Sequence, residues 1–312
     1  MAGSLGRRGF LSECLAAAAA ASAASRTGLS WAEEGKGDLE VGRGIWKSLK
    51  WNMIATEGST LDHFQMLKEV GYDGVEIDSP GGVDKDEAIQ ASQEVGLPIE
   101  GVVNSAHWDI RHSDPDPQVR DRAVQNMRTA LRDAQRVGAD SVLLVPGKVT
   151  DPQRENHEQV WQRSIAGIHE LLPLAQELRV HILIENVGNG FCTSPELFAQ
   201  YIDEIGSPWV GVHFDIGNHI WAGPPADWIR VLGPRIKKLD AKDRTRTRQE
   251  REIGEGEAGW ADIRAALREI RYRGWVAAEV RGGDRARLAD VLSRMNRVLG
   301  ESDGRPPKRS LP

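Results

Sequence analysis

Four acidic residues each stand at the end of a short apolar run, where an extended strand would turn them to the same face. In VHILIENVG, Val180, Ile182 and Ile184 alternate along the run and leave Glu185 on the opposite side. The same period of two selects one inward acid in each of the runs VGVHFDIGN, RIKKLDAKD and WVAAEVRGG, namely Asp215, Asp240 and Glu279. Converging carboxylates repel one another, and a divalent cation is the simplest way to hold them together. Oxygen ligands suit Mg²⁺ or Mn²⁺, so the sequence predicts one such ion as a cofactor.

Cationic side chains share the strand faces of these acids. Lys238 and Lys242 alternate with Asp240, and Arg281 stands two residues after Glu279, where the alternation also turns it inward. Ion pairs between these cations and the carboxylates are therefore the alternative to a metal ion. In either case, Lys242 and Arg281 could neutralise a negative site or hold the oxygens of a substrate.

The rest of the sequence must supply the elements that position these residues, and it alternates short apolar strands with amphipathic helices. Strands are predicted at residues 45–53, 74–77, 99–103, 141–145, 181–185, 210–215, 236–241 and 276–279. Helices are predicted at residues 61–70, with Thr60 as the cap, and at 86–95, 119–137, 158–178, 195–205, 226–232, 261–270 and 285–299. Strict alternation of eight strands with eight helices favours an α/β fold of the closed (β/α)8 TIM-barrel type, in one domain, over an open doubly wound sheet. Catalytic groups of such barrels lie at the carboxyl ends of the strands.

The first residues have the pattern of a targeting signal. Arg7 and Arg8 lie in GRRGFLS, an alanine-rich run follows at residues 16–24, and Ser30-Trp31-Ala32 offers a small-residue cleavage site. We expect a twin-arginine signal peptide at residues 1–32, a linker at 33–43, the barrel at 44–300 and a disordered tail at 301–312, with export to the periplasm or another extracytoplasmic compartment. The alternative is a disordered alanine-rich terminus. The apolar run is too short for a good membrane span, so no stable membrane insertion is expected after signal removal.

The composition limits the partners and the redox chemistry. A net charge of −6 gives no electrostatic case for nucleic acid, which usually needs a basic face. The two cysteines are Cys14 and Cys192. Because Cys14 lies in the segment that we expect to be removed, no internal disulfide is predicted.

Six motifs give the chain a resemblance to a known family. In chain order they are GYDGVEI, LIENVG, FDIGNHIWAG, KLDAKD, IGEGEAGW and AAEVRGG. Over residues 47–298 the sequence resembles the sugar phosphate isomerase/epimerase family with a xylose-isomerase-like barrel, which includes ketose 3-epimerases, hydroxypyruvate isomerase and inosose dehydratase. Each motif is weak alone, but their order and spacing together are fairly specific.

The resemblance implies that Glu185, Asp215, Asp240 and Glu279 bind the metal. The family usually has His where this chain has Asp240, and a carboxylate makes the predicted shell harder and more negative. The family often has His three residues after the strand-six Asp, where this chain has Asn218. An asparagine can bond a substrate hydroxyl but cannot take a proton.

The resemblance also implies a mechanism. In the family's epimerases, one glutamate removes the proton next to the carbonyl, and a second glutamate returns a proton to the enediolate. Glu185 and Glu279 are the candidates for this pair. Glu76 near strand two and His107 after strand three are candidate substrate contacts, although a lone loop histidine is more often solvated or structural.

The leading hypothesis is a divalent-metal-dependent isomerase or epimerase of a free sugar or a similar hydroxycarbonyl compound. One alternative is a metal-dependent lyase or dehydratase acting on an oxidised (keto) sugar, and another is a non-catalytic sugar-binding barrel. The related apurinic endonuclease activity is disfavoured, because it needs a His-rich multi-zinc cluster that these strand ends lack. A small-molecule carbohydrate is therefore the expected partner, and homo-oligomer formation is left open.

Overall fold

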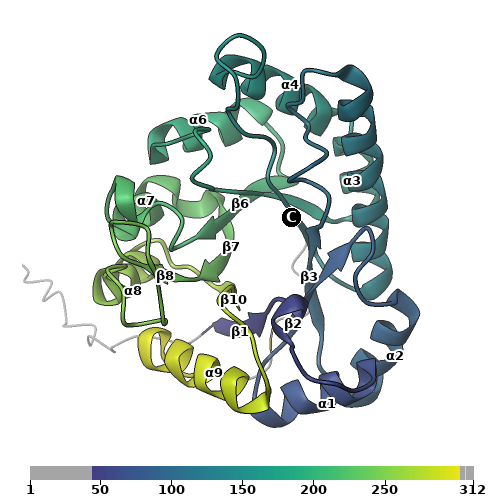
Figure 1. The fold of residues 1–312 in the computed structure, drawn as a ribbon, viewed down its shortest axis with the longest axis vertical. Coiled ribbons are helices and arrows are strands. Elements are labelled where there is room, and N and C mark those ends of the chain that lie inside the picture. The colour runs from purple at the N-terminus through teal and green to yellow at the C-terminus, as the bar shows by residue number, and fades with distance from the viewer. Residues whose placement is uncertain (1–43, 303–305, 307–312) are drawn as a thin grey trace, which may run out of the picture. The chain divides into compact units, whose positions relative to one another are not determined.

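Strands alternate with helices along the chain, and the helices surround the strands (Figure 1). The computed structural model describes residues 44–302 and residue 306. In chain order the main elements are β1 (Ile45–Leu49), α1 (Thr60–Val70), β2 (Val75–Ser79), α2 (Lys85–Val95), β3 (Ile99–Asn104), α3 (Pro117–Val137), β4 (Ser141–Leu144), α4 (His157–His169), α5 (Leu172–Leu178), β5 (His181–Glu185), α6 (Pro195–Ile205), β6 (Val210–Asp215), α7 (Pro225–Leu232), β7 (Ile236–Ala241), β8 (Asp243–Arg244), β9 (Glu250–Arg251), α8 (Trp260–Glu269), β10 (Gly274–Ala278) and α9 (Arg285–Leu299).

Eight of the strands form one parallel sheet that nearly closes on itself. Their hydrogen-bonded order is β1-β10-β7-β6-β5-β4-β3-β2. A parallel bridge from Lys50 to Glu76 links the regions of β1 and β2, the two end strands. The short antiparallel pair β8–β9 follows β7 and lies outside this sheet. The predicted (β/α)8 TIM barrel is confirmed, whereas the predicted signal peptide, the linker and most of the predicted tail lie outside the described residues.

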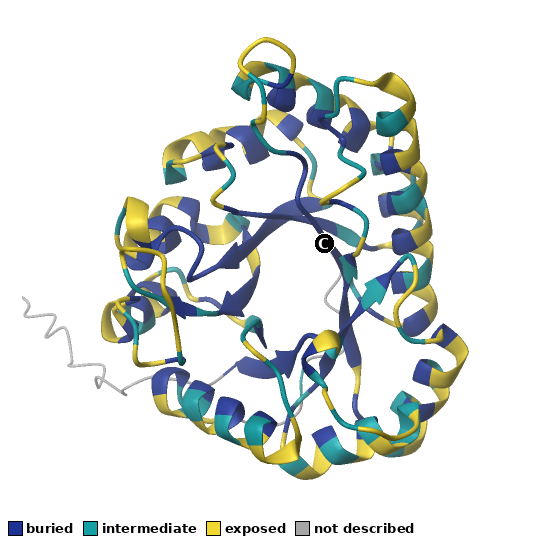
Figure 2. Cartoon of the chain, viewed as in Figure 1, coloured by how far each residue is buried: buried dark blue, intermediate teal, exposed yellow. Residues whose placement is uncertain are grey.

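Alternation along the strands determines which side chains reach the barrel interior. On β5 and β6, Ile182, Ile184, Val212 and Phe214 are buried in the hydrophobic core that the strands share with the helices. Figure 2 shows the strands buried and the helices exposed on their outer faces. Residues of the opposite parity, such as His213, therefore point towards the barrel axis.

Local signals set the ends of the helices. Ser59 caps α1 in a reciprocal box with Asp62, and Gly71 ends this helix in the left-handed conformation that glycine adopts freely. Thr60, the expected cap, is instead the first helical residue. The predicted helix at 158–178 is two helices, α4 and α5, because Pro173 lies in the first turn of α5 and cannot continue the hydrogen bonding of α4.

The first strand is shorter than predicted. β1 ends at Leu49, and Trp51–Met53 forms a single 3₁₀ turn. The Met53 carbonyl then accepts a hydrogen bond from the Gly283 N–H at 2.9 Å, which fixes this turn against the loop after β10. No helix among the described residues is long and apolar enough to cross a membrane.

We predict that Gly282→Ala destabilises the barrel, because no room exists for a side chain between the loop after β10 and the chain after β1. A Cβ at Gly282 would lie 1.9 Å from the Met53 carbonyl oxygen. Overpacking against backbone costs about 1–3 kcal/mol of the free energy of unfolding, which urea unfolding followed by circular dichroism measures. Gly188→Ala is the control, since its Cβ would meet neighbours only at 3.6 Å. Equal unfolding midpoints for the two variants would contradict the steric account.

Candidate active site

Four carboxylates meet at the carboxyl end of the barrel. One oxygen from each of Glu185, Asp215, Asp240 and Glu279 lies within 4.8 Å of the others. Glu185 and Asp215 are the last residues of β5 and β6. Asp240 is the last but one of β7, and Glu279 directly follows β10. Asp215 and Asp240 are fully buried, whereas the side chain of Glu279 is 34% exposed. The structure thus brings together the acids that strand alternation selects, with one of them open to a substrate.

The loop after β6 fixes two of these acids relative to each other. An Asp215 carboxylate oxygen accepts hydrogen bonds from the backbone N–H groups of Gly217 (2.7 Å) and Asn218 (3.0 Å). The side-chain amide of Asn186 bonds both the N–H and the C=O of Asp215. Asn218 also donates to Glu185 Oε1 at 3.1 Å. The two acids are therefore oriented by the protein before any ligand binds.

Lys242 bridges two of the four acids. Its ammonium lies 2.8 Å from Asp215 Oδ2 and 3.1 Å from Glu279 Oε2. Burial alone would lower the pKa of Lys242, but the two carboxylates raise it above its ordinary value, so the side chain is charged. Gly217 leaves room for the Lys242 side chain, because a Cβ at position 217 would lie 2.8 Å from Lys242 Cγ.

A second buried lysine, Lys50, also contacts one of these acids, although it is not among the site residues that the strand pattern predicts. It follows β1, and its ammonium lies 3.0 Å from Asp240 Oδ2 and 3.1 Å from Glu76 Oε2. Burial alone would lower the pKa of Lys50, but these two carboxylates raise it well above its ordinary value. The sequence holds a signal for this residue, because Lys50 stands two residues after the inward-facing Ser48.

Asp240 has partners on both carboxylate oxygens. Lys50 contacts Oδ2, and His213 Nε2 lies 2.9 Å from Oδ1. Burial alone would raise the pKa of Asp240, but His213 and Lys50 hold it far below its ordinary range. Each carboxylate oxygen has two lone pairs, so these contacts leave capacity for a further bond to a metal.

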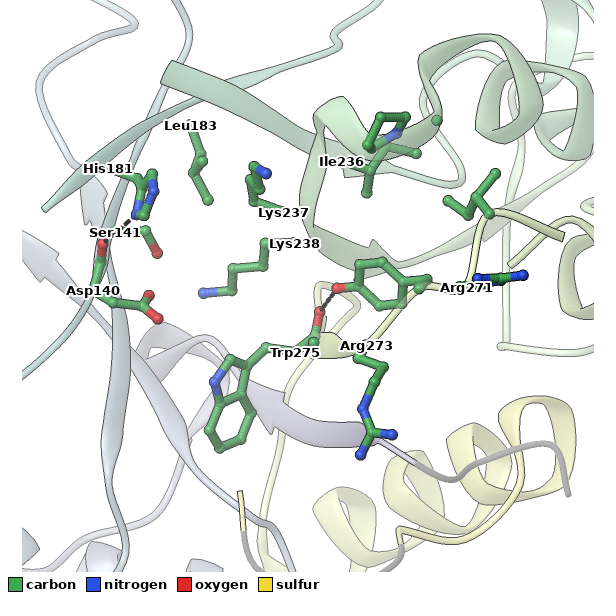
Figure 3. Close-up of a pocket in the computed structure, with 15 residues that line it drawn as sticks. Asp140, Ser141, His181, Leu183, Ile236, Lys237, Lys238, Arg271, Arg273 and Trp275 are labelled. Atoms are coloured by element: carbon green, nitrogen blue, oxygen red, sulfur yellow. Dashed lines mark hydrogen bonds between the residues drawn. The ribbon is translucent and has the colours of Figure 1, made fainter. Parts of the chain in front are cut away.

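Deeper in the barrel, a further ionic network fills the interior. The Lys238 ammonium lies 2.5 Å from Glu76 Oε1 and 2.6 Å from Glu100 Oε2, and Ser48 donates to the other Glu100 oxygen at 2.7 Å. Gly101 leaves space for this network, since a Cβ there would lie 2.3 Å from the Lys238 ammonium. Lys238 also lines a pocket of about 360 Å³ at the amino ends of β4, β5, β7 and β10 (Figure 3). Ionic contacts therefore extend from the four acids to the opposite end of the barrel.

The candidate substrate contacts Glu76 and His107 both lie in the interior. Glu76 is 1% exposed within β2, and Lys50 and Lys238 occupy its two oxygens. Burial alone would raise the pKa of Glu76, but the two lysines lower it to about 2. His107 is 3% exposed, its Nδ1 accepts the Val145 N–H at 3.3 Å, and burial lowers its pKa to about 3. In these surroundings Glu76 is a partner of Lys50, and the His107 ring is neutral. A substrate contact by either residue stays a prediction.

Arg281 lies at the mouth of the barrel, whereas alternation predicted that it points inward. β10 ends at Ala278, so the alternation does not extend to Arg281, and its side chain is exposed. Together with Lys242 and Glu279, Arg281 lines a pocket of about 600 Å³. It is therefore a neighbour of the acids, and its contact with a substrate stays a prediction.

Asp243, the last acid of KLDAKD, organises the mouth of the barrel, a role that the strand pattern does not predict. The Asp243 carboxylate accepts hydrogen bonds from the backbone N–H groups of Gly254, Gly256 and Ala258, and from the Trp260 indole at 2.8 Å. These donors all belong to IGEGEAGW. The two motifs thus form one unit that ties the segment between β9 and α8 to the end of β7.

The four acids fit a hard divalent cation. Burial raises the pKa of Glu185 well above its ordinary value, and repulsion from Glu279 adds to this effect. Burial likewise raises the pKa of Glu279. Without a further cation, the two glutamates therefore favour their protonated forms. A divalent ion among four oxygens would reverse this preference, because it stabilises the charged form of every ligand.

We predict that Lys50→Met lowers the free energy of unfolding by about 3–5 kcal/mol, because it removes one partner of the buried Asp240 charge. Glu76 keeps its contact with Lys238 in this variant. Adding Asp240→Asn should restore part of the loss, since it removes the unpaired charge. Urea unfolding of the wild type, both single variants and the double variant in metal-free buffer measures the coupling. Simple additivity of the two losses would contradict a direct interaction between Lys50 and Asp240.

Comparisons with known proteins agree with the fold. Among known sequences, an uncharacterized protein of Methanocaldococcus jannaschii is 24% identical over 211 residues, which cover 65% of this chain and 72% of the relative. SgbU of Escherichia coli K12, provisionally named an L-ribulose-5-phosphate 3-epimerase, is 24% identical over 241 residues, which cover 71% of this chain and 83% of SgbU. The crystal structure of a D-tagatose 3-epimerase-like protein superposes with a TM-score of 0.69 at 20% identity, over 81% of this chain and 98% of that one. The model of the xylose isomerase-like TIM barrel family matches residues 64–298, and the chain therefore belongs to that family.

Proposed function

We propose that this protein is a divalent-metal-dependent isomerase or epimerase of sugars. The observation that carries the proposal is the meeting of four carboxylates at the carboxyl end of the barrel, where barrel enzymes place their catalytic groups. The similarity to SgbU supports the isomerase class. It leaves the sugar itself unspecified.

The four carboxylates would hold the metal ion, and their all-oxygen donor set favours Mn²⁺ or Mg²⁺. A bound divalent ion would polarise the carbonyl and neighbouring hydroxyl oxygens of a substrate. Four ionised carboxylates carry more negative charge than one divalent ion neutralises. The ammonium groups of Lys50 and Lys242 lie beside Asp240 and Asp215 and offset the excess.

Glu185 and Glu279 are the two groups that would move the proton. One removes it from the carbon beside the carbonyl and leaves an enediolate, and the other returns a proton. Return to the opposite face gives an epimer, and return to the neighbouring carbon gives an isomer. Asn218 orients Glu185 at 3.1 Å, while the partial exposure of Glu279 lets a sugar approach it.

We predict that Glu185→Gln and Glu279→Gln each reduce activity by at least about 10²–10⁴-fold, the contribution of a general acid or base, while the fold stays intact. Solvent deuterium uptake into a panel of keto- and aldo-sugars in the presence of Mn²⁺ measures this activity. Glu269→Gln, on the exposed face of α8, is the matched control. If either site variant keeps wild-type exchange, that glutamate is not a proton-transfer group.

We predict that Asp240 contributes directly to metal affinity. Asp240→Asn should weaken Mn²⁺ binding by more than the roughly 10–100-fold typical of a residue that only supports a ligand. Asp240→His should keep binding but move the preference towards Zn²⁺ or Co²⁺, because imidazole suits those ions. Calorimetric titration of each metal into the wild type and both variants measures these changes. Equal Mn²⁺ affinities in all three proteins would rule out Asp240 as a ligand.

We also propose that the chain is exported through the twin-arginine route, because Arg7 and Arg8 precede a weakly apolar run. This route carries folded proteins, which suits an enzyme that binds its metal before export. Replacing both arginines with lysine is expected to retain the precursor in the cytoplasm, as cell fractionation would detect. Unchanged export of that variant would refute the signal assignment.

A further inference from the structure

The pocket at the barrel mouth adjoins the candidate site and provides access to it. Its volume of about 600 Å³ lies within the range of small-molecule sites. Lys242 and Glu279 belong to both the site and the pocket, and Asn52, Arg251 and Arg281 line other parts of it. Glu279 is also the most exposed of the four acids. A substrate that approaches Glu279 from this side therefore passes the arginines.

Five cationic and five acidic side chains line the pocket, but four of the acids are already engaged. Asp243 is bound by backbone N–H groups. Glu252 lies 2.8 Å from Arg287, and Glu255 lies 2.6 Å from Arg294. Glu279 pairs with the Lys242 ammonium at 3.1 Å. These four acids therefore contribute little uncompensated negative charge to the pocket, and Glu250 is largely exposed to solvent.

Three of the four arginines of the pocket are engaged far less than the fourth, Arg287, which pairs with Glu252 and Asp290. Arg251 donates to the Glu250 carbonyl and to the Gln249 side chain, both neutral groups. Arg281 makes no ion pair within the part of the chain that the structure describes. Arg244 pairs with Glu250, whose side chain is 76% exposed, and a surface pair of this kind is worth little. Guanidinium groups with spare donors thus flank the route to Glu279.

We infer that this pocket binds an anionic group of the substrate, so that the substrate is a sugar bearing a carboxylate or a phosphate away from the reacting carbon. That the substrate is a sugar rests on the proposed function. Guanidinium groups bind both kinds of anion through paired, charge-assisted hydrogen bonds. Arg251 and Arg281 would hold the anion while the reacting carbon lies beside Glu279.

The test compares three matched ligands, a neutral ketohexose and the same sugar with a terminal carboxylate or a terminal phosphate. Calorimetry in the presence of Mn²⁺ gives their affinities for the wild type, Arg251→Gln, Arg281→Gln and the double variant. Arg271→Gln is the matched control, because Arg271 is an exposed arginine of the pocket at the amino ends of the strands. Solvent deuterium exchange into each sugar is measured on the same samples.

The wild type is expected to bind a charged sugar about 10- to 100-fold more tightly than the neutral one, the range for a charge-assisted hydrogen bond. The double variant should lose this preference and keep its affinity for the neutral sugar, and Arg271→Gln should behave as the wild type. The more tightly bound anion, carboxylate or phosphate, identifies the substrate class.

Equal affinity for neutral and charged sugars in the wild type would overturn the inference, as would a charge preference that survives in the double variant. Failure of every charged sugar to bind at millimolar concentration would also overturn it. Solvent deuterium exchange without tighter binding of the charged sugars counts against the anion-binding pocket alone. A charge preference without exchange counts against the proposed isomerase alone.

Discussion

Repulsion among carboxylates at the centre of the barrel is the constraint on which the rest of the structure depends. Glu185, Asp215, Asp240 and Glu279 converge within 4.8 Å, in surroundings where water screens little of their charge. Lysines at the strand ends supply the compensation, because Lys50 after β1 pairs with Asp240 and Lys242 after β7 pairs with Asp215. Parallel strands in a ring make this arrangement available, since all their carboxyl ends meet at one edge.

The compensation also explains how an aspartate is accommodated at position 240. An acid there adds negative charge to the site, and Lys50 returns a positive charge at 3.0 Å. Glu76 holds Lys50 from the other side, and Lys238 holds Glu76. Each buried charge thus depends on the next, down to the interior of the barrel. A substitution at Lys238 would therefore disturb the ion pairs that hold Asp240, although a substrate would meet the four acids rather than Lys238.

Strand periodicity predicts the acids and the two lysines of KLDAKD, Lys238 and Lys242, correctly, but it misses Lys50 and misplaces Arg281, for physical reasons. Glu185 ends a regular strand, so a period of two fixes its direction. Arg281 lies beyond the end of β10, where loop backbone no longer follows that period. The apolar pattern extends the predicted first strand to residue 53, which hides Lys50 as a residue at a strand end. The pairing of Lys238 with Glu100 joins β7 to β3, and such a contact depends on closure of the whole sheet.

The most direct measurement of the central claim is anomalous diffraction from crystals of the protein grown with Mn²⁺. The account predicts one Mn²⁺ peak bounded by oxygens of Glu185, Asp215, Asp240 and Glu279, with the Lys50 ammonium outside its ligand shell. A peak at the neighbouring group of Glu76, His213 and Asp240, or no peak among these carboxylates at saturating Mn²⁺, would contradict it.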